Sequence, residues 1–166
     1  MTNRAQAIED KHGGAPPSKD SLRLWLKLLT CTSVIEKRVR GRLRQRFGTT
    51  LPRFDVLATL DHAAGPLRMG QLSSRLLVSN GNVTGLVSRL EAEGYVSRIA
   101  DAADRRTFYV TMTPRGRRSF DQMAAAHEDW IEDMFQSLEA GEIAAMMEGL
   151  DHIKLALANK PTGASR

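Results

Sequence analysis

Apolar side chains recur every three or four residues over most of the chain, and this spacing predicts a mainly helical protein. Glycine and proline divide the pattern into separate helices. Gly48 ends the first helix, Gly65-Pro66 breaks the second, and Gly94 stops the fourth. The predicted helices cover residues 18–47, a short segment that starts at Pro52, residues 69–76, residues 80–93, a segment that Thr113 caps and Pro114 opens, and residues 139–157.

After Gly94 the spacing of apolar residues changes from the helical period to alternation, which predicts β-strands. Residues 95–99 and 107–113 form the two expected strands, and residues 101–106 form the tip between them. Two short helices joined by a tight turn and followed by such a hairpin make a winged helix-turn-helix. The sequence therefore predicts a mainly α fold with a small β-hairpin wing.

The helix at residues 80–93 has an unusual exposed face. Its apolar stripe is narrow, and the opposite face carries small residues that include Gly81 and Gly85. Each glycine inside a helix costs about 1 kcal/mol relative to alanine. A small, lightly polar face lets a helix approach another surface closely, and the major groove of DNA is such a surface. The alternative is a helix that is simply unstable at the protein surface.

The DNA interpretation assigns base or phosphate contacts to the start and the small face of this helix. It assigns phosphate or minor-groove contacts to two arginines of the hairpin tip, one of which Asp104 is expected to hold by ion pairing. The candidate DNA-binding residues are Ser79, Asn80, Asn82, Thr84, Gly85, Ser88, Arg89, Arg105 and Arg106.

The first helix is apolar on nearly all sides in its N-terminal half, where Leu24, Leu26 and Val34 lie outside the main stripe. Such a helix must be covered nearly all round, and a small monomer has little chain with which to cover it. We therefore expect a partner chain to cover it. The C-terminal half is rich in arginine, which forms either a solvated basic face or a basic rim beside an apolar cleft.

Charge is unevenly distributed along the chain. The formal net charge is +5 and the pI is about 9.8. Residues 65–118 hold nine arginines and four acidic residues, whereas residues 121–151 hold nine acidic residues and no lysine or arginine. This asymmetry indicates that one face meets an anion, such as duplex DNA, while another does not.

The remaining composition favours a cytoplasmic protein that is not an enzyme. The single cysteine, Cys31, excludes an internal disulfide and fits a reducing compartment. No apolar run approaches the length of a membrane span, and residues 1–18 lack the apolar core of a signal peptide. The four histidines are scattered, so neither a metal or cofactor site nor a catalytic constellation is expected.

Residues 83–98, VTGLVSRLEAEGYVSR, resemble the recognition helix and following strand of the MarR family of transcriptional regulators. The wing, DAADRR at residues 101–106, and its exit, VTMTPRG at residues 110–116, are similar to those of the same family, with Met112 where leucine is common. The resemblance extends over about residues 20–157. It implies a homodimer joined through its first and last helices, a pseudo-palindromic DNA site, and a small-molecule cleft whose ligand usually releases the DNA.

The expected architecture is then a winged helix-turn-helix inserted between dimerisation helices. The expected function is that of a ligand-responsive transcriptional regulator that represses its target genes. The predicted regions are a flexible arm at 1–18, a helical dimerisation domain at 19–50 and 114–158, a winged helix-turn-helix at 51–113, and a flexible tail at 159–166.

Residues 21–31, 50–55 and 79–82 look like a subgroup that regulates aromatic-acid catabolism, some members of which answer to hydroxycinnamoyl-CoA thioesters. Apolar walls at the junction of the first two helices suit an aromatic group, and the arginines nearby suit phosphates. The expected effector is an aromatic acyl-CoA thioester or an aromatic acid, unless these arginines reach only DNA or solvent. The candidate ligand-binding residues are Trp25, Leu28, Leu29, Arg40, Arg44, Arg46, Arg53, Phe54 and Leu57.

Two other functions stay open at this point. A winged helix that compacts DNA or docks a protein would share the fold without sensing a ligand. A redox sensor would use Cys31, although the sequence offers no resolving cysteine, and a plain buried thiol is the alternative for that residue.

Overall fold

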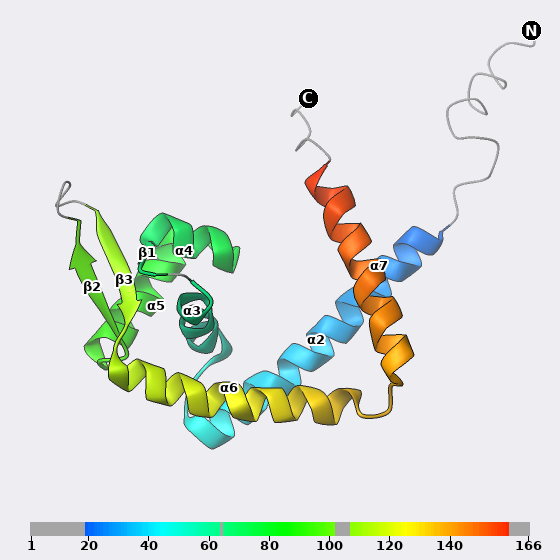
Figure 1. Cartoon of the computed structure of the whole chain (residues 1–166), viewed down its shortest axis with the longest axis horizontal. Helices are drawn as coiled ribbons and strands as arrows, with labels where there is room; N and C mark the ends of the chain where they lie inside the picture. Colours follow the sequence, from blue (N-terminus) through cyan, green and yellow to red (C-terminus); the bar gives the residue numbers. More distant parts are fainter. Residues whose placement is uncertain (1–18, 64, 102–106, 160–166) are drawn as a thin grey trace, which may run out of the picture. The chain divides into compact units, whose positions relative to one another are not determined.

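A computed structural model describes residues 19–63, 65–101 and 107–159 (Figure 1). The chain divides into two compact units, Met1–Asp55 and Val56–Arg166, and each is described by itself. The elements in order are α2 (Asp20–Phe47), α3 (Leu51–Asp61), β1 (Leu67–Arg68), α4 (Met69–Leu76), α5 (Asn80–Ala92), β2 (Val96–Ala100), β3 (Phe108–Met112), α6 (Pro114–Phe135) and α7 (Ala140–Ala158). The order of elements agrees with the prediction of a mainly α fold with a small β wing.

The first unit is dominated by α2, a helix of 28 residues. Gly48 ends the helix in the left-handed conformation, with φ of 61°, which glycine adopts without a steric penalty. Val39 and Leu43 are buried, but the N-terminal half leaves its large apolar side chains exposed, including Trp25 at 57%. Cys31 is also exposed, so the expectation of a buried thiol is wrong for the single chain. The reason is that the described residues of the first unit include no other element to cover this half of the helix.

The second unit contains a helix-turn-helix formed by α4 and α5. Leu72 on α4 and Val83, Val87 and Leu90 on α5 are all at most 1% exposed. Two bonds with the hydroxyl of Ser73 secure the turn: the hydroxyl donates to the Gly70 carbonyl and contacts the side chain of Asn80. These contacts bury the apolar stripe of α5 and leave its small face outward.

The sheet has three strands, where the sequence analysis predicted two. β3 lies in the middle and pairs with β2 on one side and with the two-residue strand β1 on the other, both antiparallel. β1 escaped prediction because two residues between Pro66 and the start of α4 are too few to show alternation. Phe108 lies at the outer end of β3 and is exposed at 42%, whereas Val110 in the strand centre is fully buried.

A tight junction joins the end of α5, the wing and the start of α6. Gly94 reverses the chain with φ of 76°, as its predicted role as a helix stop requires. Thr113 caps α6: its hydroxyl accepts from the Gly116 amide at 3.0 Å and donates to the Gly94 carbonyl at 2.7 Å. A Cβ on Gly116 would overlap the Tyr95 carbonyl oxygen, so this close approach requires glycine.

The two C-terminal helices differ in burial. α6 buries Phe120, Met123 and Ala126 along one stripe. None of the 19 residues of α7 is buried, and Met147 is 62% exposed. The spacing of apolar residues in α7 predicts a stripe that seeks a partner surface, but the described residues of the second unit leave this stripe exposed.

Candidate nucleic-acid interface

The small face of α5 is open in the structure. A Cβ built on Gly81 would meet nothing within 4 Å, and one on Gly85 would meet only the flexible Arg89 guanidinium, at 3.6 Å. Neither glycine has a positive φ, so the backbone does not require glycine at either position. The protein therefore keeps two destabilising glycines in a helix although its own packing has room for side chains there.

Several candidate DNA-binding side chains on α5 already have partners within the chain. The Thr84 hydroxyl donates to the Asn80 carbonyl at 2.9 Å, and Arg89 Nε donates to the Gly85 carbonyl at 3.2 Å. Ser79 occupies the N-cap position, but its side chain makes no capping bond, and Asn80 instead contacts Ser73 across the turn. The amide of Asn82 is exposed and makes no hydrogen bond with any part of the chain that the structure describes.

Ser88 is held by a residue that the sequence analysis did not single out. Arg98 on β2 donates to the Ser88 hydroxyl at 2.6 Å and pairs with Glu91 at 3.3 Å. The backbone amide of Arg98 also donates to the Glu91 carboxylate, at 3.1 Å. One arginine thus joins the recognition helix to the inner edge of the wing. Its spacing from Ser88 and Glu91 fits no single helix or strand, so periodicity gave no signal for it.

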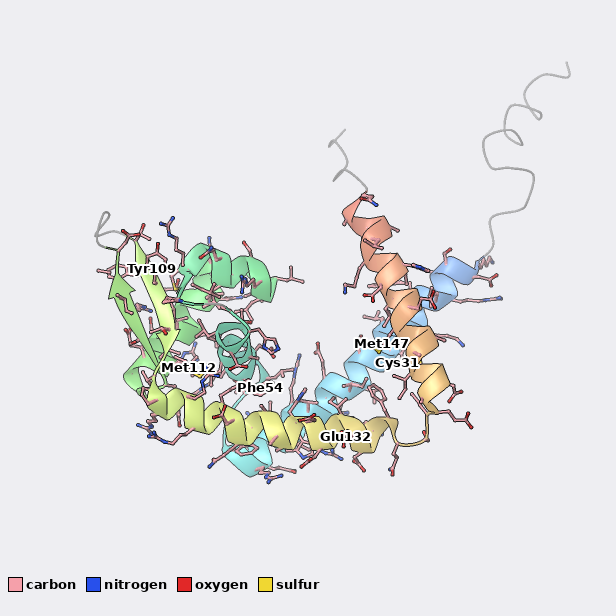
Figure 2. The ribbon with its side chains drawn as sticks, viewed as in Figure 1. Cys31, Phe54, Tyr109, Met112, Glu132 and Met147 are labelled. Carbon is pink, nitrogen blue, oxygen red and sulfur yellow. The ribbon has the colours of Figure 1, made fainter. Side chains whose placement is uncertain are left out.

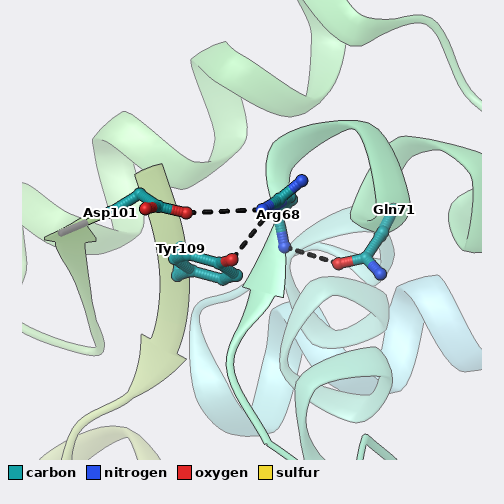
Figure 3. A network of polar contacts seen from close by, with 4 residues as sticks. All are labelled: Arg68, Gln71, Asp101 and Tyr109. Carbon is teal, nitrogen blue, oxygen red and sulfur yellow. Dashed lines mark hydrogen bonds and ion pairs between the residues drawn. The ribbon is translucent and has the colours of Figure 1, made fainter. Parts of the chain in front are cut away.

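Arg68 makes a second arginine contact on the other side of the wing (Figure 3). Its Nε donates to the Tyr109 hydroxyl at 3.0 Å, and its terminal nitrogen pairs with Asp101 at 3.3 Å. The guanidinium carbon also lies 5.3 Å from the centre of the Tyr109 ring. Tyr109 and Met112 lie toward opposite ends of β3, so this contact is near the outer end of the wing (Figure 2). The sequence analysis missed Arg68 because it missed β1.

The two wing arginines that the sequence analysis assigned to DNA, Arg105 and Arg106, lie outside the described residues, and so does Asp104. The wing is described up to Asp101 and again from Thr107, where the Asp101 amide donates to the Thr107 carbonyl at 2.9 Å. The assignment of the two arginines to phosphate contacts stays a prediction.

The candidate ligand-binding residues divide into exposed and buried groups. Trp25 and Leu29 are exposed at 57% and 46%, and Leu28 is half-buried on the same helix. Phe54 and Leu57 on α3 are buried, with only 7% and 2% of their surface exposed, so they offer little surface to a ligand in this chain. Among the arginines, Arg44 is exposed on α2, Arg46 stacks over the neighbouring ring of Phe47 at 5.4 Å, and Arg53 is half-buried on α3.

Acidic groups accompany the expected basic rim. Arg40 pairs with Glu36 at 2.6 Å. Burial, and then the charge of Glu36, raise the pKa of Asp55 to about 6, while Arg40 acts in the opposite direction. Arg40, a candidate ligand-binding residue, therefore has a carboxylate partner within its own helix.

A shallow basic groove lies on α2, and its cations are not among the arginines predicted to bind the ligand. Its volume is about 510 Å³, and Gly41 opens it by contributing no side chain. The groove is lined by Val34, Lys37, Arg38, Gly41, Arg42 and Gln45. These positions are three or four residues apart, so helical periodicity could have identified the face, although not its hollow.

Two classes of site were also sought in the described residues. Within residues 19–63, 65–101 and 107–159, no group of three or more histidine, cysteine or acidic side chains is arranged to hold a metal ion. In the same ranges no helix combines the length and the apolar character that crossing a membrane requires.

Known proteins resemble this chain in sequence and in structure. A family model described as MarR family matches residues 47–107. The transcriptional activatory protein BadR of Rhodopseudomonas palustris is 35% identical over 104 residues, which cover 61% of this chain and 59% of BadR. The HTH-type transcriptional regulator YkoM of Bacillus subtilis is 34% identical over 110 residues, which cover 66% of this chain and 70% of YkoM. The crystal structure of a MarR family transcriptional regulator from Silicibacter pomeroyi is 28% identical, has a TM-score of 0.73, and aligns over 86% of this chain and 99% of its own.

Proposed function

Because the chain belongs to the MarR family of winged-helix transcriptional regulators, we propose that it reads a specific operator as a homodimer and changes transcription in response to a small aromatic ligand. The open glycine face of α5 is the observation that carries the DNA-reading part of this proposal. Such a regulator would work in the cytoplasm, where the chromosome lies.

The α5 face suits the major groove for a steric reason. The major groove is about 12 Å wide and admits an α-helix, and a small inward face lets the helix backbone come close to the bases. Gly81 and Gly85 remove side chains where the fold has room for them, and Asn82 presents an exposed amide beside them. An asparagine amide can bond to both N6 and N7 of adenine, so Asn82 is the residue that we assign to base recognition.

The homodimer is supported by uncovered apolar surface. In α7 the side chains of Met146, Met147 and Leu150 are exposed at 48%, 62% and 44%. In α2, described separately, Leu22 and Trp25 are each exposed at 57%. Contiguous apolar surface of this kind marks an interaction site in soluble proteins. A two-fold dimer would present two recognition helices to the two halves of a pseudo-palindromic site.

The test of DNA reading is a titration of duplex DNA from the region upstream of its own gene against a shuffled duplex at fixed salt. We expect operator binding at least a thousandfold tighter than binding to the shuffled duplex, as for specific regulators. A DNA-compacting protein would instead bind both duplexes alike. Gly85→Leu should abolish operator binding without unfolding the protein, because the space beside Gly85 is open.

The matched control for this variant is Ala125→Leu, which adds bulk at an exposed position of α6. It should leave operator affinity unchanged. Normal operator binding by Gly85→Leu would show that α5 does not enter the groove, and equal loss in both variants would show a general effect on the fold.

The ligand part of the proposal rests on the exposed Trp25 and Leu29 and on the basic groove of α2. An aromatic acyl group needs an apolar surface, and the phosphates of a CoA thioester need several cations. Calorimetry should compare benzoyl-CoA and coumaroyl-CoA with their free acids and with bare CoA. We expect the thioesters to bind most tightly and to weaken operator binding.

Two variants test the role of the arginines. Arg38→Ala, which removes a cation that lines the groove, should weaken thioester binding, whereas Arg23→Ala, at the start of α2 and paired with Asp20, should not. If the free acids bind as tightly as the thioesters, the phosphate argument fails and only an aromatic-acid effector is left. A peroxide response that Cys31→Ser removes would instead favour redox sensing.

The direction of regulation is a separate question, because BadR is named as an activatory protein and the sequence analysis expected repression. We propose repression that ligand relieves. A reporter fused to the upstream region decides the point: deletion of the gene should raise expression, and lower expression after deletion would assign activation.

A further inference from the structure

Arg68 stands at a position where arginine is unfavourable for the local helix. It is the N-cap residue of α4, and its side chain makes no capping bond to the helix. Serine, threonine, aspartate and asparagine are preferred at an N-cap, and a positive charge at a helix N-terminus opposes the helix dipole. A residue that weakens its own helix is expected to contribute elsewhere.

The side chain of Arg68 reaches across the sheet to the outer part of the wing. Arg68 pairs with Tyr109 in the β1–β3 ladder, and its guanidinium contacts both the Tyr109 hydroxyl and the Asp101 carboxylate. Figure 3 shows both partners on one side of Arg68, while Gln71, on its other side, accepts a bond from the Arg68 backbone amide. Asp101 directly follows β2, so one side chain links the start of α4 to both long strands.

The wing has few other attachments on this side. β1 has only two residues, whereas β2 and β3 pair along five residues each. On the opposite side Arg98 ties β2 to α5 through Ser88 and Glu91. In addition to the buried core of the sheet, where Val96 and Val110 are at most 2% exposed, one arginine at each edge links the hairpin to the helix-turn-helix.

We propose that Arg68 is a positioning residue for DNA recognition, which fixes the wing relative to α4 and α5 through Asp101 and Tyr109. This inference rests on the proposed function, because it assumes that the wing and α5 meet the same duplex. Arg68 acts on DNA affinity through the wing. We expect Arg68 to be dispensable for folding, because its side chain is 55% exposed and is not part of the buried core.

Two substitutions separate this role from simpler ones by the sign of their effect. Asp101→Asn removes a negative charge, so electrostatics alone would strengthen DNA binding. Arg68→Thr introduces a preferred N-cap residue, so it should keep or raise the thermal midpoint of unfolding. If the contacts of Arg68 with Asp101 and Tyr109 position the wing, both variants should nevertheless bind the operator more weakly, by about tenfold each.

The experiment measures thermal unfolding, and operator affinity at several salt concentrations, for Arg68→Thr, Asp101→Asn, Tyr109→Phe and the double variant of Arg68 and Asp101. We expect Tyr109→Phe to lower operator affinity by about threefold. The double variant should bind no more weakly than the weaker-binding of its two single variants, because either change alone already breaks the Arg68–Asp101 pair. Arg118→Thr and Asp121→Asn, at exposed positions of α6, make the same types of charge change away from the wing and should alter affinity by less than about twofold.

Four results would overturn the inference. Tighter operator binding by Asp101→Asn would show that its charge only repels DNA. Additive losses in the double variant, with a salt slope reduced only where Arg68 is absent, would make Arg68 a direct phosphate contact. Affinities that follow the thermal midpoints would give Arg68 a structural role. Unchanged affinity in all variants, with normal wild-type binding, would contradict the positioning role of Arg68 and leave the proposed function standing. A wild-type protein that does not prefer the operator would contradict the proposed function itself.

Discussion

The winged helix-turn-helix and α7 have similar apolar periodicity but opposite burial. In α5 the residues Val83, Val87 and Leu90 are at most 1% exposed. In α7 the equivalent stripe is uncovered, and Met147 and Leu157 are 62% and 68% exposed. The first region covers itself within one chain, and the second does not. Periodicity alone therefore identifies which residues seek burial, but not whether the same chain provides it.

The largest effect should come from charging the uncovered stripe. We expect Met147→Glu combined with Leu150→Glu to dissociate the proposed dimer, because a buried carboxylate without a partner is strongly unfavourable. Operator affinity should fall by on the order of a thousandfold through loss of the second half-site. Sedimentation and DNA titration measure the two effects, and Glu148→Gln is the matched control. A charged variant that stays dimeric would place the interface elsewhere.

A smaller effect, on the free energy of unfolding, should distinguish the winged region from α7 when a glycine in each is replaced by alanine. Gly116→Ala should destabilise the fold by about 3 kcal/mol, because its Cβ would overlap the Tyr95 carbonyl oxygen and press on Met112 Cγ at 2.9 Å. Gly149→Ala in α7 meets nothing within 4 Å and should stabilise the helix by up to about 1 kcal/mol. Chemical denaturation of both variants checks this. Similar destabilisation would mean that α7 packs tightly at Gly149 in the assembly.

The next smaller effect should come from replacing Asn82, the residue of α5 that we assign to base recognition. We expect Asn82→Ala to lower operator affinity by about 2 kcal/mol and to relax preference at one A·T pair, because an asparagine amide bonds to adenine. The control is Gln122→Ala, at an exposed position of α6. Binding to a set of single-base operator variants measures the preference, and an unchanged profile would exclude Asn82 as a base contact.

The smallest effect concerns the first unit. Asp55 has a pKa of about 6 in place of 3.8, so the folded protein binds this proton more readily than the unfolded chain does. Stability from this group should therefore be fully present below about pH 4, fall as the pH rises from about 4 to about 6, and stay level above that range. Asp55→Asn should remove this dependence and raise stability at pH 7.5 by about 1 kcal/mol, allowing for partial solvent exposure. Unfolding curves from pH 4 to 8 test it, and equal pH dependence in both proteins would contradict the assignment.

Local signals predicted most of the winged region. Met69–Leu76 was predicted with its observed bounds, and Gly94 and the Thr113 cap have the predicted roles. These features depend on neighbouring residues, so the sequence displays them directly. The family assignment, which depends on the same stretch, is confirmed by the comparisons.

Contacts between distant residues were not predictable in the same way. Arg68 meets Asp101 at a sequence separation of 33 residues, and Arg98 meets Ser88 at a separation of 10. Charge counts revealed an arginine-rich middle but not which arginines are paired. One feature of the sequence did point to a role for Arg68. It is an arginine at the start of a predicted helix, where capping residues such as serine or aspartate are preferred.

The Thr113 junction also has an evolutionary consequence. Gly94 and Gly116 are fastened to each other through one threonine hydroxyl, so the chain between them forms a loop with fixed ends. Within that loop the five-residue pairing of β2 with β3 fixes the lengths of both strands. Insertions and deletions in related regulators should therefore accumulate between Asp101 and Thr107, where a change in length shifts neither end, and should be rare at the junction itself.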